Sequence, residues 1–228
     1  MDADQVATLR ALLANSSWLE RAGVLGKALR TSTKTPGGLL VVGTPAEEPW
    51  HLTAHLDEES RLSGIAELTP TLVRWSPPPG APPHLAVGLS RLEAARRGET
   101  LFVVAEDAAP APLLERVNDA RHVGATILAL DGGDPELDEL AHEFLSLPGG
   151  RPLPGGAPPG IPQRTGGLPV PPYPPGLVTF DGAQHLVSAA AGIRDETLTG
   201  GGRSTGRGVR ALRGRLARLL DAVSGPTA

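Results

Sequence analysis

Two histidines, His51 and His55, stand four residues apart in a segment with helical spacing, so one helix face would carry both side chains. This spacing suits a divalent metal ion, and carboxylates flank the pair on both sides: Glu47, Glu48, Asp57, Glu58 and Glu59. The alternative is a solvated helix face whose acidic first turn favours the helix dipole. Because the pair is not part of an H-E-x-x-H motif, the sequence favours this alternative, and we predict no metal ion and no cofactor.

The same segment contains residues suited to proton transfer. Glu58 or Glu59 could serve as the base that removes a proton next to a carbonyl group, which is the step that an isomerase of sugars requires.

A third group of residues lies in the stretch VVAEDAAPAPLLE, residues 103 to 115, which joins a predicted strand to a predicted helix. In an α/β protein such a loop often holds a phosphate group at the helix N-terminus, where backbone N–H groups point outward. Here the loop carries Glu106 and Asp107, and Pro110 and Pro112 have no N–H to donate. The loop therefore has the position of a phosphate site, but its residue types oppose a phosphate.

An alternating series of segments must position these residues. Short apolar runs predict strands at 39–43, 71–75, 100–105, 125–130 and 143–147. Helical spacing predicts helices at 51–66, 84–97, 111–123, 135–142 and 180–192. We expect Asp134 to cap the helix that begins at Pro135. The alternation predicts an α/β three-layer sandwich with a five-stranded parallel sheet in the flavodoxin-like order 2-1-3-4-5.

The flanks and one insert have a different composition. Residues 1–35 predict an N-terminal helical segment that includes a helix at 4–15, and residues 36–193 predict the α/β domain. Within this domain, the Pro- and Gly-rich residues 148–176 predict a flexible insert. Residues 194–228 predict a Gly-rich hinge and a basic amphipathic helix at 209–223.

Bulk composition excludes several classes of protein. The net charge of −4 and the pI near 5.9 do not suit the whole protein to electrostatic binding of nucleic acid. The absence of cysteine excludes disulfides, thiol nucleophiles and zinc–thiolate sites. No apolar run approaches the ~20 residues that span a bilayer, and the acidic N-terminus lacks the apolar region of a signal peptide. We therefore expect a cytoplasmic protein without a membrane partner.

The order and pattern of these segments resemble the sugar isomerase (SIS) fold of phosphosugar isomerases and phosphosugar-sensing regulators. The resemblance is clearest over residues 100–147, which contain TLFVVA, GATILAL and ELAHEFLSL. The first strand and its turn, LLVVGTPAEEPW, are similar to the opening strand and glycine-rich turn of that family, and QHLVSAAAG fits its C-terminal helix. The resemblance covers residues 36–147 and 178–193 and lies in pattern and order rather than in signature residues.

The family's phosphate loop resembles S-x-S-G-x-[ST], and residues 105–110 read AEDAAP instead, so all three hydroxyls and the glycine are missing. The first turn departs as well, because the family prefers G-x-G-x-S and residues 43–47 read GTPAE. In the expected sheet, ligands bind at the carboxyl ends of the strands where the strand order reverses. This edge gives the candidate ligand contacts Gly43, Thr44, Trp50, Ala105, Glu106, Asp107 and Ala108, and the alternative for Trp50 is a packing residue.

His185 resembles the ring-opening histidine of some SIS enzymes, and the alternative is a half-buried helix residue bonded to a backbone carbonyl. The function that we predict is a non-catalytic, dimeric SIS-like domain that binds a carbohydrate derivative or a protein partner. The second hypothesis is a sugar-phosphate isomerase with a rearranged site that uses Glu58 or Glu59, together with His185, as catalytic residues. The third is an assembly or regulatory protein that acts through the basic helix at 209–223.

Overall fold

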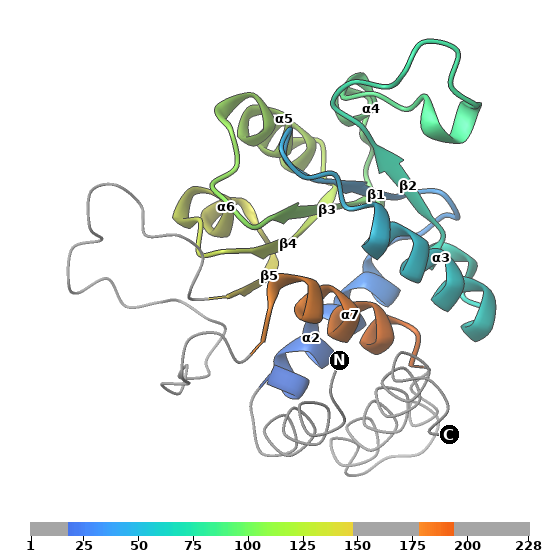
Figure 1. The fold of residues 1–228 in the computed structure, drawn as a ribbon, viewed down its shortest axis with the longest axis vertical. Coiled ribbons are helices and arrows are strands. Elements are labelled where there is room, and N and C mark those ends of the chain that lie inside the picture. The colour runs from blue at the N-terminus through green and yellow to red at the C-terminus, as the bar shows by residue number, and fades with distance from the viewer. Residues whose placement is uncertain (1–17, 148–177, 194–228) are drawn as a thin grey trace, which may run out of the picture.

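The computed structural model describes residues 18–147 and 178–193 (Figure 1). At its centre lies a five-stranded parallel sheet in the order β2-β1-β3-β4-β5. The strands are β1 (Leu39–Val42), β2 (Pro70–Val73), β3 (Thr100–Ala105), β4 (Thr126–Asp131) and β5 (Glu143–Ser146). The predicted fold class and strand order are confirmed.

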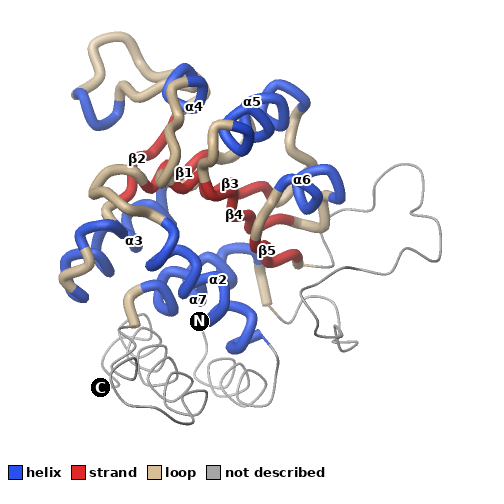
Figure 2. The backbone as a smooth tube through the Cα atoms, turned by 180° about the vertical axis from the view of Figure 1, so that it is seen from behind, coloured by secondary structure: helices blue, strands red, loops and turns tan. Residues whose placement is uncertain are grey.

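Helices cover both faces of the sheet, as Figure 2 shows from behind. One face carries α2 (Trp18–Ser32), α3 (Trp50–Ser63) and α7 (Phe180–Ala191). The other carries α4 (Ser90–Glu93), α5 (Ala111–His122) and α6 (Pro135–Leu140). Two short 3₁₀ helices, η1 (Ala66–Leu68) and η2 (Pro83–Leu85), flank β2 in sequence. The predicted helices at 4–15 and 209–223 and the insert at 148–176 lie outside the described residues.

The sheet divides the apolar core into two clusters, because successive side chains of a strand point to opposite faces. In β3, Phe102 and Val104 pack with α2, α3 and α7, whereas Leu101 and Val103 pack with α4, α5 and α6. All six residues of β3 are buried, which explains why the strand reads as an uninterrupted apolar run.

The predicted helix at 84–97 is wrong. Residues 83–85 form η2, and the α-helix is confined to Ser90–Glu93. Between them, the backbone N–H of Arg74 donates to Val87 O over 2.8 Å, and Arg74 and Gly88 form a parallel bridge. Residues 87 and 88 therefore pair with the backbone just after β2. This pairing replaces the helix that the spacing of apolar residues predicts.

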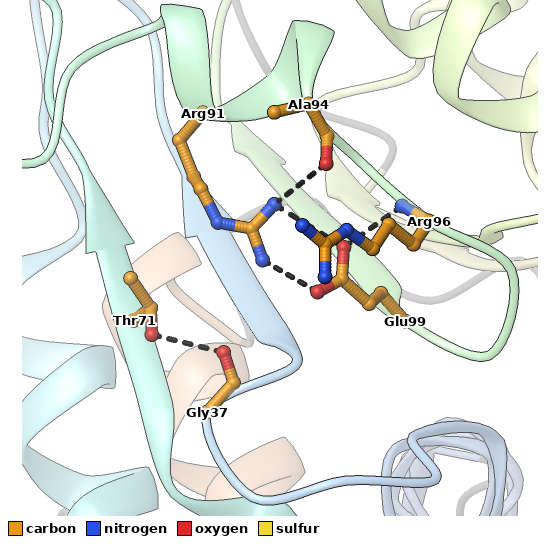
Figure 3. Close-up of polar contacts among 6 residues, drawn as sticks. All are labelled: Gly37, Thr71, Arg91, Ala94, Arg96 and Glu99. Carbon is orange, nitrogen blue, oxygen red and sulfur yellow. Dashed lines mark hydrogen bonds and ion pairs between the residues drawn. The ribbon is translucent and has the colours of Figure 1, made fainter.

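Polar contacts fix the amino ends of the central strands (Figure 3). Arg91 donates to both carboxylate oxygens of Glu99, and the backbone N–H of Arg96 donates to the same carboxylate over 2.9 Å. The Thr71 hydroxyl donates to Gly37 O over 3.1 Å and joins the start of β2 to the residues before β1. These contacts lie at the amino ends of the strands, whereas the candidate site lies at the opposite edge of the sheet, at their carboxyl ends.

Candidate functional site

The sheet order reverses between β1 and β3, since the chain leaves β1 toward β2 and then returns to β3 on its other side. In open α/β sheets, ligands bind beside the carboxyl ends of the strands at such a reversal. The loops that leave β1 and β3 lie at this edge, and all the predicted ligand contacts lie in these loops or at the adjoining ends of β3 and α3.

The loop after β1 is held against the end of β2. The Trp75 indole N–H donates to Gly43 O over 2.8 Å. The Glu48 carboxylate accepts from Arg74 Nε over 2.8 Å and from the backbone N–H of Trp75 over 3.1 Å. A Cβ at Gly43 would lie 2.6 Å from Pro49 Cδ, so only glycine fits there.

Two predicted ligand contacts in this loop have different surroundings. Thr44 is buried, and its hydroxyl accepts from the backbone N–H of Glu47 over 3.2 Å, so the hydroxyl stabilises the turn. Trp50 begins α3 with 41% of its surface exposed, and the Arg74 guanidinium lies 4.4 Å from its ring centroid. Trp50 thus exposes aromatic surface to solvent at this edge.

The loop after β3 exposes Glu106, Asp107 and Ala108, whereas Ala105 is buried at the end of the strand. The backbone N–H of Ala109 donates to Asp134 Oδ2 over 2.7 Å and is therefore not free to bind an anion. Pro110 precedes α5, and no side chain caps that helix. The loop thus presents carboxylates and offers few backbone donors.

Four carboxylates from three segments form what we call the acidic rim: Glu47, Glu106, Asp107 and Asp181. Partial burial raises the pKa of Glu47, and the negative charges of Glu106, Asp181 and Asp107 raise it further. Because these charges act on Glu47 together, the rim carries a negative potential at this edge of the sheet.

Beside the rim lies what we call the histidine cluster: His51, His55 and His185. The ring centroids are 4.6 Å apart for His51 and His55, 4.8 Å for His51 and His185, and 4.6 Å for His55 and His185. Burial, followed by the neighbouring histidines, lowers the pKa of His55. Burial also lowers the pKa of His185, which Asp181 partly opposes. Lowered pKa values favour neutral imidazoles, which can accept a proton or bind a metal ion.

The sequence identified His51 and His55 as a pair but could not show that His185 joins them. Glu58 and Glu59, the predicted bases, lie on α3 in different surroundings. Glu58 is exposed, with Oε2 3.9 Å from His55 Nδ1, whereas Glu59 is buried. Glu58 therefore lies beside His55, and His55 in turn lies beside His185.

A second polar group, which the sequence did not predict, lies at the ends of β4 and β5. Asp131 is fully buried and accepts from the backbone N–H groups of Gly133 and Asp134 over 2.6 and 3.1 Å. The Ser146 hydroxyl lies 3.3 Å from carboxylate oxygens of both Asp131 and Asp138. Burial and the charge of Asp131 raise the pKa of Asp138 to about 8. The only sign of this group in the sequence was Asp131, a charged residue directly after the strand predicted at 125–130.

Asp138→Asn is expected to stabilise the protein at alkaline pH. The stabilising contribution of a protonated Asp138 is complete below its unfolded-state pKa of 3.8 and is lost as the pH rises through about 8. Because solvent screens the half-buried side chain, we expect a gain of about 1–2 kcal/mol above pH 8 and little gain near pH 4. Urea unfolding between about pH 4 and pH 9 measures the difference in the free energy of unfolding, and Asp119→Asn, an exposed change on α5, is the control. Parallel pH profiles for wild type and Asp138→Asn would contradict the expectation.

A comparison with models of known protein families finds no match, and neither does a comparison with curated proteins. Among the residues that the structure describes, no helix is both long enough and apolar enough to cross a membrane.

Proposed function

We propose that the protein is a non-catalytic SIS-like domain that binds a carbohydrate derivative without a phosphate group. The binding surface lies between the loops after β1 and β3, and the acidic rim is the observation that carries the proposal. Four carboxylates from three segments raise the local negative potential, which disfavours a dianion at this edge.

The same carboxylates favour sugar hydroxyls. A carboxylate accepts hydrogen bonds from hydroxyl groups, and such charge-assisted bonds are about twice as strong as neutral ones. Trp50 adds an exposed aromatic ring at this edge, and aromatic rings cover the apolar C–H faces of ligands in many binding sites. Together, Trp50 and the acidic rim suit a neutral or amine-bearing sugar.

The discriminating experiment compares glucosamine, glucose and glucose 6-phosphate by isothermal titration calorimetry. Electrostatics predicts the tightest binding for the cationic amino sugar and a loss of about tenfold or more for the phosphate relative to glucose. The double variant Glu47→Gln/Asp107→Asn should weaken glucosamine binding and reduce the discrimination against the phosphate. The double variant Glu115→Gln/Asp119→Asn, two exposed changes on α5, serves as the charge-matched control. Tighter binding of the phosphate to wild-type protein would overturn the proposal.

An isomerase is the second candidate, and the arrangement of Glu58, His55 and His185 favours it. The contact between Glu58 and His55, and the proximity of His55 to His185, would allow proton transfer. Aldose–ketose conversion by the wild type that falls in both Glu58→Gln and His185→Gln would favour the enzyme. We expect no conversion.

The dimeric state and the cytoplasmic location belong to the same proposal. A chain without cysteine suits a reducing compartment. Light scattering on the full chain tests the dimer, and a molar mass near that of one 23.5 kDa chain would contradict it.

A further inference from the structure

Half of the chain's six histidines gather at one point of the fold. His51 and His55 come from α3, and His185 comes from α7, more than 120 residues later in the sequence. One ligating atom from each of the three lies within 4.8 Å of the corresponding atoms of the other two. Helix geometry explains the first two, because residues four apart share a face. Only the packing of α7 beside α3 explains the third (Figure 1).

The position of His185 is fixed by its helix. α7 packs closely on α2, where the Arg30 guanidinium donates to Ala190 O. Phe180, Leu186 and Val187 of α7 are buried in the same core cluster as Leu52 and Leu56 of α3. A cluster that stands on two mutually packed helices needs little backbone movement to bind a ligand.

The spacing of the imidazoles is compatible with closure around a metal ion. At a Zn–N distance of about 2.0–2.1 Å, tetrahedral ligand nitrogens lie roughly 3.4 Å apart. The ligating atoms, which lie within 4.8 Å of one another, therefore need to approach by up to about 1.4 Å. Side-chain rotation can supply this movement, since His51 is exposed and can rotate.

Carboxylates complete the surroundings of the histidine cluster. Asp181 Oδ2 lies 3.6 Å from His185 Nε2, and Glu58 Oε2 lies 3.9 Å from His55 Nδ1. Carboxylates in such positions bind the metal as a further ligand or hold an imidazole ring in its ligating orientation.

From this geometry, we propose that His51, His55 and His185 bind one divalent transition-metal ion, with Asp181 as the supporting carboxylate. Imidazole ligands select zinc, copper or nickel rather than calcium or magnesium, which prefer oxygen ligands. A site of three histidines and one carboxylate fits Zn²⁺, and we commit to that ion. The inference does not rest on carbohydrate binding, because the metal alone serves as the probe.

The experiment titrates EDTA-treated full-length protein with Zn²⁺ in the presence of a competing chelator and with Co²⁺ by visible absorption. We expect one equivalent per chain and the intense d–d bands of a four-coordinate cobalt site. His185→Gln should weaken Zn²⁺ binding about 100-fold or more, and Asp181→Asn about tenfold. His84→Ala, an exposed histidine away from the cluster, should change nothing.

Circular dichroism establishes that each variant is folded, and His51→Ala, exposed on α3, provides a second ligand variant if His185→Gln unfolds. Zn²⁺ binding by wild-type protein that is no tighter than binding by a His51→Ala/His55→Ala double variant would overturn the inference. An equal loss in His84→Ala would also overturn it, because it would indicate binding by surface histidines in general.

Discussion

Replacing Gly26 by alanine is expected to lower the free energy of unfolding by about 2–3 kcal/mol and the melting temperature by about 5–10 °C. Gly26 is buried in α2 at the contact with α7. A Cβ at this position would lie 2.6 Å from Ala190 Cβ and 2.7 Å from the backbone of Ala190 and Ala191. Because backbone cannot move aside as a flexible side chain can, the two helices would have to separate.

Gly23→Ala is the matched control, since Gly23 lies in the same helix and a Cβ there would meet nothing within 4 Å. Alanine favours a helix over glycine, so this variant should gain about 0.5–1 kcal/mol. Thermal unfolding followed by circular dichroism separates the two variants. If Gly26→Ala were as stable as Gly23→Ala, the close approach of α2 and α7 would be refuted.

Replacing Asp134 by alanine is expected to cost about 3 kcal/mol of stability. Asp134 Oδ1 accepts from the backbone N–H groups of Glu136 and Leu137 and caps α6. Its Oδ2 accepts from Ala109 N–H in a buried contact that joins the loop after β3 to α6. Losing the cap costs about 1 kcal/mol, and leaving a buried N–H without a partner costs about 1–3 kcal/mol.

Asp134→Asn tests which of these contacts dominates. Asparagine keeps one oxygen for the cap or for Ala109 but cannot supply both, so its stability should lie between those of wild type and Asp134→Ala. Urea unfolding gives the three values, and the exposed Asp119→Ala on α5 controls for the loss of a charge. Equal stability of Asp134→Ala and Asp119→Ala would contradict the double role of Asp134.

The fold could be predicted from the sequence because its strands are buried on both faces. Strands such as Leu39–Val42 and Thr100–Ala105 consist almost entirely of apolar residues between turns. Such runs are typical of strands that are buried on both faces of a parallel sheet, so they can be recognised without knowledge of the tertiary contacts. The cap at Asp134 was also predictable, since a capping residue acts on N–H groups two and three positions along the chain. The 84–97 segment was not, because its pairing beside β2 is a tertiary interaction.

The candidate site was only partly predictable for the same reason. The loops at Gly43 and Glu106 each follow a strand, so the topology of the parallel sheet is enough to predict that both lie at its carboxyl edge. The meeting of His185 with His51 and His55 depends on which helix lies beside α3, and no local pattern encodes that choice. Burial likewise makes the carboxyl groups of Asp131 and Asp138 interact, although each residue alone is typical of a loop or helix surface.

The late place of α7 in the chain has a consequence for biosynthesis. The sheet can form once Ser146 has left the ribosome, but the face with Phe102 and Leu128 still lacks the helix that ends at Ala191. At roughly 5–20 residues per second, translation leaves this apolar face half-covered for several seconds. During that interval the nascent chain exposes part of an apolar sheet face to which chaperones can bind. A truncated chain released from a ribosome that stalls there would be prone to aggregate.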